Sequence, residues 1–129
     1  MLAAGFFIEY LFDPASQLFF GCVVVTVVIS IVLHELAHAW AAIWQGDDTP
    51  RLQGHMTADP MVHMGGMSLL MLVLVGFAFG AMPVNPRNFR SKYGDALVSV
   101  AGPAMNFLLA LVSLLALGLW LKVGGLAAE

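Results

Sequence analysis

The hydrophobic residues of this chain fall into long blocks that contain almost no charge. Residues 18–44 contain no proline and one charged side chain, Glu35. Residues 96–121 contain no charged side chain, although Gly102 and Pro103 interrupt the apolar pattern. At about 1.5 Å per residue, a helix of either length exceeds the ~30 Å hydrocarbon core of a bilayer. The pattern therefore predicts two transmembrane helices, over residues 18–44 and 96–121.

A third apolar block, over residues 67–82, is shorter, and a helix of this length would reach only roughly 24 Å. It is consistent with a short third span or with a re-entrant segment that enters the bilayer and returns. Arg51 precedes the block, and three further cations follow it within residues 87–92. Because cations favour the cytoplasmic side of a membrane, the re-entrant arrangement is favoured, with residues 46–66 and 83–95 both cytoplasmic.

The N-terminal residues 1–12 are apolar but lack the basic region of a signal peptide, so we expect an interfacial helix that ends before Pro14. The composition supports a membrane protein, since 60% of the 129 residues are hydrophobic and 10% are charged. Soluble domains carry about 25% charged residues. This excludes an ordinary cytosolic domain, a disordered chain and a nucleic-acid-binding protein. The expected fold is an all-α integral membrane protein with a single membrane domain over residues 1–129.

The charge inside the first span belongs to an H-E-x-x-H pattern formed by His34, Glu35 and His38. Residues four apart project from one face of a helix, so the two histidines can bind one metal ion, and zinc suits this ligand set. Glu35 lies about 100° away around the helix and can act as a general base toward a metal-bound water. Ionisable groups inside a span cost on the order of 2.5–3.5 kcal/mol each and are usually functional. The structural alternative is a His/Glu cluster that hydrogen bonds to other helices.

Three motifs follow one another along the chain. The first is HELAHAW over residues 34–40, followed by Gly46 and Asp47. The second is MPVNPRNFR over residues 82–90, and the third is AGPAMN over residues 101–106. In this order they resemble the site-2 protease family of intramembrane zinc metalloproteases, in particular its short bacterial members. The resemblance extends over most of the chain.

The resemblance implies cleavage of transmembrane helices of other proteins by zinc-activated water, in the inner membrane of a bacterium. It implies that His34 and His38 are zinc ligands and that Glu35 is the catalytic acid/base. Asn106 would be a supporting residue close to the site, with an interhelical hydrogen bond as its structural alternative. The expected partners are a transmembrane protein substrate and the lipid bilayer.

Several neighbouring residues are expected to be structural rather than chemical. The Gly102-Pro103 pair is expected to serve helix packing and a kink. The Asp47-Asp48 pair after Gly46 is expected to mark an ordinary helix exit, and Asp95 to cap the helix of the last span.

The sequence departs from the family's pattern at the third zinc ligand. The family supplies this ligand as an aspartate in an L-D-G motif after A-G-P-x-x-N, and residues 107–129 contain no such motif. The family's N-P-x-x-H-I-D-P segment reads DPMVHMGG over residues 59–66, which keeps His63 and places Gly65 at the acidic position. We consider His63 as the third ligand, with a structural loop histidine as its alternative. A partner chain, a second copy of this chain or a segment outside these 129 residues is another source.

Two further functions stay open. The chain ends at Glu129 before an L-D-G helix, which motivates a catalytically inactive, protease-derived scaffold subunit of a larger membrane complex as the alternative to an enzyme. Methionines near His55 and His63 also leave Cu(I) binding open, because thioethers and imidazoles are soft ligands. The main hypothesis is the core of an intramembrane zinc metalloprotease.

Overall fold

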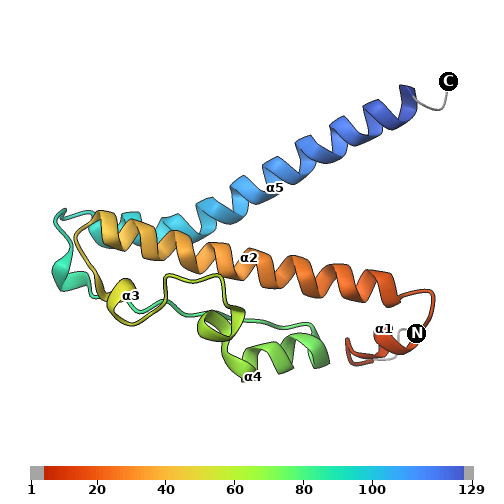
Figure 1. Cartoon of the computed structure of the whole chain (residues 1–129), viewed down its shortest axis with the longest axis horizontal. Coiled ribbons are helices and arrows are strands. Elements are labelled where there is room, and N and C mark those ends of the chain that lie inside the picture. The colour runs from red at the N-terminus through yellow and green to blue at the C-terminus, as the bar shows by residue number, and fades with distance from the viewer. Residues whose placement is uncertain (1–4, 127–129) are drawn as a thin grey trace.

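The computed structural model describes residues 5–126, and this part of the chain contains helices, turns and extended segments but no β-strand (Figure 1). Two of the helices are long and apolar enough to cross a membrane, which confirms the predicted all-α fold class. In chain order the helices are α1 (Glu9–Phe12), α2 (Gln17–Trp44), α3 (Thr49–Leu52), α4 (Pro60–Val75), the short 3-10 helix η1 (Pro86–Asn88) and α5 (Gly94–Leu126).

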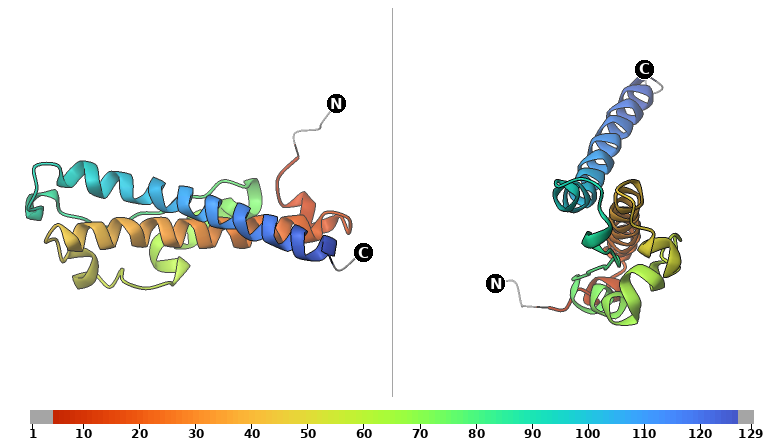
Figure 2. Two further views of the ribbon diagram at one scale, coloured as in Figure 1. Left: turned by 90° about the horizontal axis from the view of Figure 1, so that it is seen from above. Right: turned by 90° about the vertical axis from the view of Figure 1, so that its left-hand side faces the viewer.

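The two long helices, α2 and α5, run antiparallel and contact each other over only part of their length. The C-terminal half of α2 lies along the N-terminal part of α5, and the rest of α5 diverges from α2 (Figures 1 and 2). The predicted spans 18–44 and 96–121 both lie within these helices. Pro103 lies inside α5 without ending it. The close helix–helix contact therefore lies beside the H-E-x-x-H turn of α2.

The buried core is small, and most large apolar side chains of the two long helices are exposed. Leu18 at the start of α2 is 80% exposed, and Trp120 in α5 is 76% exposed. An apolar surface of this extent is unusual for a soluble monomer and is the surface that a bilayer would cover. The buried apolar residues of the helices are Phe20, Val32, Leu36, Ala37, Ala39, Ala42, Met64, Leu72 and Val98.

The helix α4 starts earlier and ends earlier than the apolar block over residues 67–82. Pro60 is its first residue, and the carboxylate of Asp59 caps it by accepting the N–H of Met61 at 2.8 Å. Proline is favoured at this position because its missing N–H would have no helical partner. The helix ends at Gly76, which adopts φ +77° and donates its N–H to the carbonyl of Leu72. Glycine tolerates this left-handed conformation, so the chain can reverse there.

After this reversal, residues 77–85 return along α4 as an extended segment (Figure 1). The hydroxyl of Ser68 accepts the N–H of Phe79 at 2.8 Å and donates to the carbonyl of the same residue at 2.6 Å. The N–H of Ala81 donates to the carbonyl of His63 at 2.9 Å. Helix α4 and the returning segment thus form a hairpin, and its position in a bilayer stays a prediction.

The N-terminal segment lies beside the tip of this hairpin. The ring of Phe7 stacks on Phe20 of α2 with centroids 4.9 Å apart. The N–H of Ile8 donates to the carbonyl of Leu74 at 3.2 Å. Helix α1 is a single turn that ends before Pro14, while the first four residues of the predicted interfacial helix lie outside the described residues.

Candidate metal centre

The two histidines of the H-E-x-x-H pattern lie side by side on α2 and both contact α5. The ring centroids of His34 and His38 are 4.7 Å apart, and the ring planes are inclined by 78°. Gly102 of α5 is buried against both rings. A Cβ added at Gly102 would collide with the Nε2 atoms of both histidines and lie 2.7 Å from Cδ2 of His34. The two Nε2 atoms therefore lie close to each other, against the backbone of Gly102.

The orientation of His38 is fixed by the backbone of α5. Its Nδ1 lies 2.6 Å from the carbonyl oxygen of Val98. A carbonyl oxygen only accepts hydrogen bonds, so Nδ1 carries the ring proton and Nε2 keeps its lone pair. Support of this kind by a backbone carbonyl is typical of metal-binding histidines. His38 is thus held ready to bind a metal through Nε2.

His34 has a side-chain partner instead of a backbone carbonyl. Asn106, one turn after Gly102 on α5, places its amide nitrogen 3.0 Å from Nδ1 of His34. The amide oxygen of Asn106 accepts the hydroxyl of Ser30 at 3.1 Å. Asn106 therefore lies against a candidate metal ligand and also joins the two helices by hydrogen bonds.

Glu35 is buried on the side of α2 that faces the returning segment of the hairpin. A Cβ added at Gly80 would lie 2.6 Å from Oε1 of Glu35 and 2.8 Å from Cγ2 of Ile31, so only glycine permits this close approach. A cavity of about 390 Å³ opens beside the contact, between α2, the returning segment and α5. Its lining consists of Glu35, His38, Gly80, Ala81, Met82, Val84, Val98 and Ser99.

Two imidazole rings side by side, next to a buried carboxylate, suit zinc, which binds imidazole nitrogen well. A catalytic zinc usually takes three protein ligands and leaves one position open. Within residues 5–126, no group of three or more His, Cys, Asp and Glu side chains is arranged to hold a metal. His34 and His38 are therefore part of a candidate centre that needs a further ligand.

The structure does not bring His63 to this pair. His63 is 3% exposed, and its Nε2 lies 2.6 Å from the carbonyl oxygen of Thr57. Its neighbouring histidine is His55, with ring centroids 6.1 Å apart. The hydrogen bond to Thr57 closes the loop before α4. Cu(I) binding by this second pair of histidines stays a prediction.

Asp47, directly after α2, is fully buried and holds the loop that leads into α5. Its carboxylate accepts the N–H of Asn85 at 2.7 Å, the side-chain amide of Asn88 at 2.9 Å, and both the N–H and the hydroxyl of Thr49. The interpretation of Asp47 as an ordinary helix exit is therefore wrong. The carboxylate ties the end of α2 to the segment that lines the cavity.

These hydrogen bonds also determine the charge state of Asp47. Burial alone would raise the pKa of its carboxyl, but the hydrogen bonds from Thr49, Asn85 and Asn88 outweigh burial and hold the pKa below its ordinary value. A carboxyl with a lowered pKa in the folded state contributes stability that is complete above its ordinary pKa of about 4. This stability is lost as the pH falls through the lowered value.

We expect Asp47→Asn to destabilise the fold by about 1–3 kcal/mol, because an amide donor would replace a carboxylate oxygen that accepts buried N–H groups. Thermal unfolding in detergent measures the effect, and the advantage of the wild-type chain should shrink below about pH 4. Asp48→Asn is the matched control, since Asp48 pairs with exposed Arg51 at 2.6 Å and such pairs contribute under about 1 kcal/mol. Equal effects of the two substitutions at neutral pH would contradict the role of Asp47.

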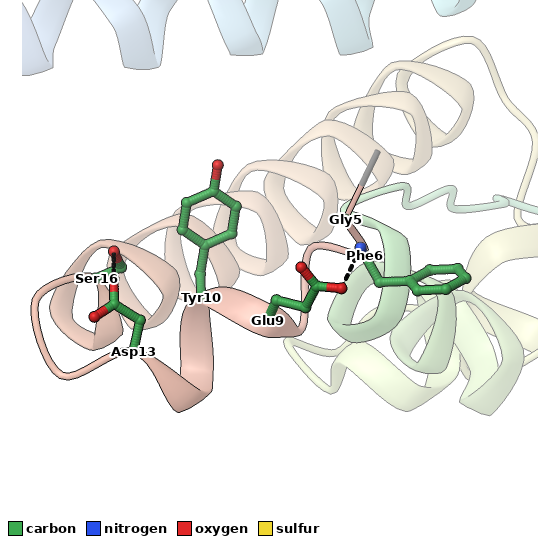
Figure 3. A pocket seen from close by; sticks show the side chains of 6 residues that line it. All are labelled: Gly5, Phe6, Glu9, Tyr10, Asp13 and Ser16. Atoms are coloured by element: carbon green, nitrogen blue, oxygen red, sulfur yellow. Dashed lines mark hydrogen bonds between the residues drawn. The ribbon is translucent and has the colours of Figure 1, made fainter. Parts of the chain in front are cut away.

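A second cavity, of about 230 Å³, lies at the N-terminal segment and is lined in part by Glu9 and Asp13 (Figure 3). The side chain of Glu9 points toward Phe6, and that of Asp13 points toward Ser16. Glu9 accepts the N–H of Phe6 at 3.2 Å, and Asp13 accepts the hydroxyl of Ser16 at 2.6 Å. The hydrogen bonds from Ser16 and then from the N–H of Ala15 hold the pKa of Asp13 below its ordinary value. Both carboxylates therefore stabilise local turns, and the cavity carries no evident chemistry.

Comparison with known proteins agrees with the motifs. The model of peptidase family M50 matches residues 22–124. The chain is 36% identical over 106 residues to "Putative zinc metalloprotease YwhC" of Bacillus subtilis, and the aligned region covers 81% of this chain and 48% of that protein. It is 31% identical over 93 residues to "Putative zinc metalloprotease Rip2" of Mycolicibacterium smegmatis, and the aligned region covers 67% of this chain and 36% of that protein.

The chain thus spans about half or less of the length of these curated relatives. No solved structure matches it significantly. The family match covers most of the chain and includes the two histidines, Glu35 and the segment of α5 that contacts them. The chain belongs to peptidase family M50, the site-2 protease family of zinc metalloproteases.

Proposed function

We propose that this chain forms the core of an intramembrane metalloprotease that cleaves transmembrane helices of other proteins. The close approach of the His34 and His38 rings, next to buried Glu35 on the same turn of α2, is the observation that carries the proposal. Zinc held by these nitrogens would polarise the scissile carbonyl and lower the pKa of the attacking water. In this proposal the third ligand comes from outside the residues that the structure describes or from a partner.

Glu35 would move the protons of the reaction. A general base must lie within hydrogen-bond reach of the proton that it abstracts. Glu35 borders the same cavity as His38, so it can take a proton from an attacking water and return it to the leaving amine. Its burial excludes bulk water from this exchange.

The returning segment of the hairpin would hold the substrate. Backbone groups point alternately to the two edges of an extended chain, and Phe79 and Ala81 use theirs to bind α4. Gly80 and Met82 then direct their N–H and carbonyl groups to the other edge, where no hydrogen bond within residues 5–126 engages them. An unwound substrate can pair with this edge as an added strand. A helical substrate must unwind first because its own hydrogen bonds occupy its backbone.

Contacts between two loops support the proposed position in the membrane. The loops over residues 46–66 and 83–95 are joined by the hydrogen bonds of Asp47 and by the one from the N–H of Arg90 to the carbonyl of Gln45 at 2.8 Å. These contacts support the proposal that both loops lie on one side, and the positive residues favour the cytoplasmic side of a bacterial inner membrane for it.

Zinc content tests the proposal. We expect the detergent-solubilised protein, together with the chain or partner that supplies the third ligand, to bind about one zinc ion in equilibrium dialysis, and His34→Ala to lose it, because the site then keeps only two of its three ligands. His55→Ala is the matched control, since His55 hydrogen bonds its own loop through Gln53 at 3.0 Å. Zinc-free protein, or equal loss in both variants, would contradict the proposal and favour the inactive scaffold subunit.

A further inference from the structure

Asp47 attaches the returning segment of the hairpin to the end of α2. Its fully buried carboxylate accepts the N–H of Asn85 at 2.7 Å and the side-chain amide of Asn88 at 2.9 Å. Asn85 is the last residue of the extended segment 77–85, and Asn88 is the last residue of η1. Asp47 therefore holds the chain at the point where it leaves the cavity beside Glu35.

The part of the segment that lines the cavity lies between two attachments. Helix α4 accepts the N–H of Ala81 at 2.9 Å, and Asp47 accepts the N–H of Asn85. Residues 82–84 lie between these points and make no hydrogen bond within residues 5–126. Two of them line the cavity. Their position beside the candidate site therefore depends on the two attachments.

Two prolines make this part of the segment stiff. A proline fixes its own φ at about −65° and keeps the preceding residue out of the helical region. Pro83 and Pro86 therefore hold Met82 and Asn85 extended, and Asn85 has φ −117° and ψ 100°. Because the chain between them is stiff, a displacement of Asn85 also displaces Met82.

We propose that Asp47 is a positioning residue, which fixes residues 82–84 beside Glu35 and so determines which peptide bond of a bound substrate is cut. A substrate that pairs with this edge as an added strand takes its register from the edge. Successive residues of a strand are about 3.3 Å apart, and a misplacement of about 1 Å can cost about 100-fold in rate. This use of the register rests on the proposed function, whereas the attachment of residues 82–84 by Asp47 is a property of the fold.

The carboxylate of Asp47 divides its contacts unequally between its two oxygens, which allows a selective substitution. Oδ1 accepts the N–H and the hydroxyl of Thr49 and the amide of Asn88, whereas Oδ2 accepts only the N–H of Asn85. In Asp47→Asn the amide oxygen satisfies the larger set of donors. The amide nitrogen then faces the N–H of Asn85, and this attachment is lost because both groups only donate.

Asn88→Asp weakens the same attachment from the other side. It places a second carboxylate against Asp47 in place of an amide donor, and two carboxylates repel each other. Neither substitution changes a candidate metal ligand, so both act on the returning segment.

The first test is hydrogen exchange of the metal-free chain in detergent micelles, followed by mass spectrometry. We expect exchange over residues 85–91 to become about tenfold faster or more in Asp47→Asn and in Asn88→Asp, because the N–H groups there open to water when the attachment is lost. Exchange in α4 stays at the wild-type rate. Unchanged exchange over residues 85–91, or an equal acceleration in every helix, would overturn the proposal.

The second test is the position at which a transmembrane reporter is cut in native membranes, with the products identified by mass spectrometry. The protein is assayed together with the chain or partner that supplies the third ligand. We expect Asp47→Asn and Asn88→Asp to cut about 10–100-fold more slowly and to add cuts at neighbouring peptide bonds, because the substrate loses its fixed register. Zinc content stays at the wild-type value. Cuts by both variants at the wild-type bond alone contradict the proposal.

Thr49→Val is the matched control. It removes a hydrogen bond to the same carboxylate, but Thr49 lies in α3 and not on the returning segment. We expect a lower unfolding temperature, with wild-type exchange over residues 85–91 and the wild-type cut. If Thr49→Val shifts the cuts as Asp47→Asn does, Asp47 only stabilises the fold and the proposal is overturned. If the wild-type protein cuts no reporter, the proposed function fails, and the exchange test then decides by itself whether Asp47 positions the segment.

Discussion

Glu35→Gln is expected to lower the rate at which the protein, assayed in native membranes, cleaves a transmembrane reporter by about 100-fold or more, while zinc stays bound. General acid–base catalysis typically contributes 10²–10⁴-fold. Glutamine matches glutamate in shape but accepts no proton at its amide, so the cavity stays intact and the proton transfer is lost. Glu35 lies on α2 beside the metal-facing histidines without joining them in a group of three ligands within residues 5–126. Zinc content should therefore be unchanged.

The control for this substitution is Glu9→Gln. Glu9 is also a carboxylate in an apolar stretch, but it is exposed and accepts the N–H of Phe6 in the N-terminal turn. It should leave the cleavage rate at the wild-type value. Cleavage by Glu35→Gln at a rate close to wild type would show that another group moves the proton, and would remove the mechanism proposed for this site.

The elements of this fold that the sequence predicts well are those determined by local pattern. The helix over residues 18–44 and the shared face of His34 and His38 depend only on apolar length and on the period of a helix. Both are seen in α2. The all-α class follows from the same regularity, because a bilayer leaves an isolated segment few ways to satisfy its backbone.

The features that the sequence does not reveal depend on contacts between distant residues. Asp47 meets Asn85 and Asn88 across about 40 positions, and no local pattern distinguishes such a carboxylate from a helix-terminal one. The reversal in residues 67–82 differs, because the re-entrant arrangement favoured from the sequence already requires one. The structure places it at Gly76, and hydropathy alone does not locate it, since the apolar block continues through this residue.

Gly102 is a residue at which the sequence predicts a close contact but does not identify the contacting residues. An interior glycine costs a helix about 1 kcal/mol relative to alanine, so it needs a compensating close approach. Gly102 does lie at a close helix–helix contact, as expected, but the sequence does not show that the residues it contacts are His34 and His38. That depends on the register between two antiparallel helices, which only the structure shows.

Gly102→Ala is expected to weaken zinc binding about 10–100-fold. The added Cβ would collide with the Nε2 atoms of both His34 and His38, so it would displace both rings from the positions in which they can share a metal. Overpacking of this kind costs about 1–3 kcal/mol, and each 1.4 kcal/mol is a factor of ten in affinity. Competition with a chromogenic chelator measures the loss. Alanine favours a helix more than glycine does, so the substitution keeps the helical preference of α5. Its effect on zinc binding therefore comes from the contact between the added Cβ and the two histidine rings.

Gly118→Ala separates this local effect from a general effect of alanine on α5. Gly118 lies in the same helix, and a Cβ added there would meet no atom within 4 Å. We expect wild-type zinc affinity in this variant and an equal or slightly higher unfolding temperature. If Gly102→Ala binds zinc as tightly as Gly118→Ala, the two imidazoles do not bind the metal at the face of α5, and the candidate centre must lie on another side of α2.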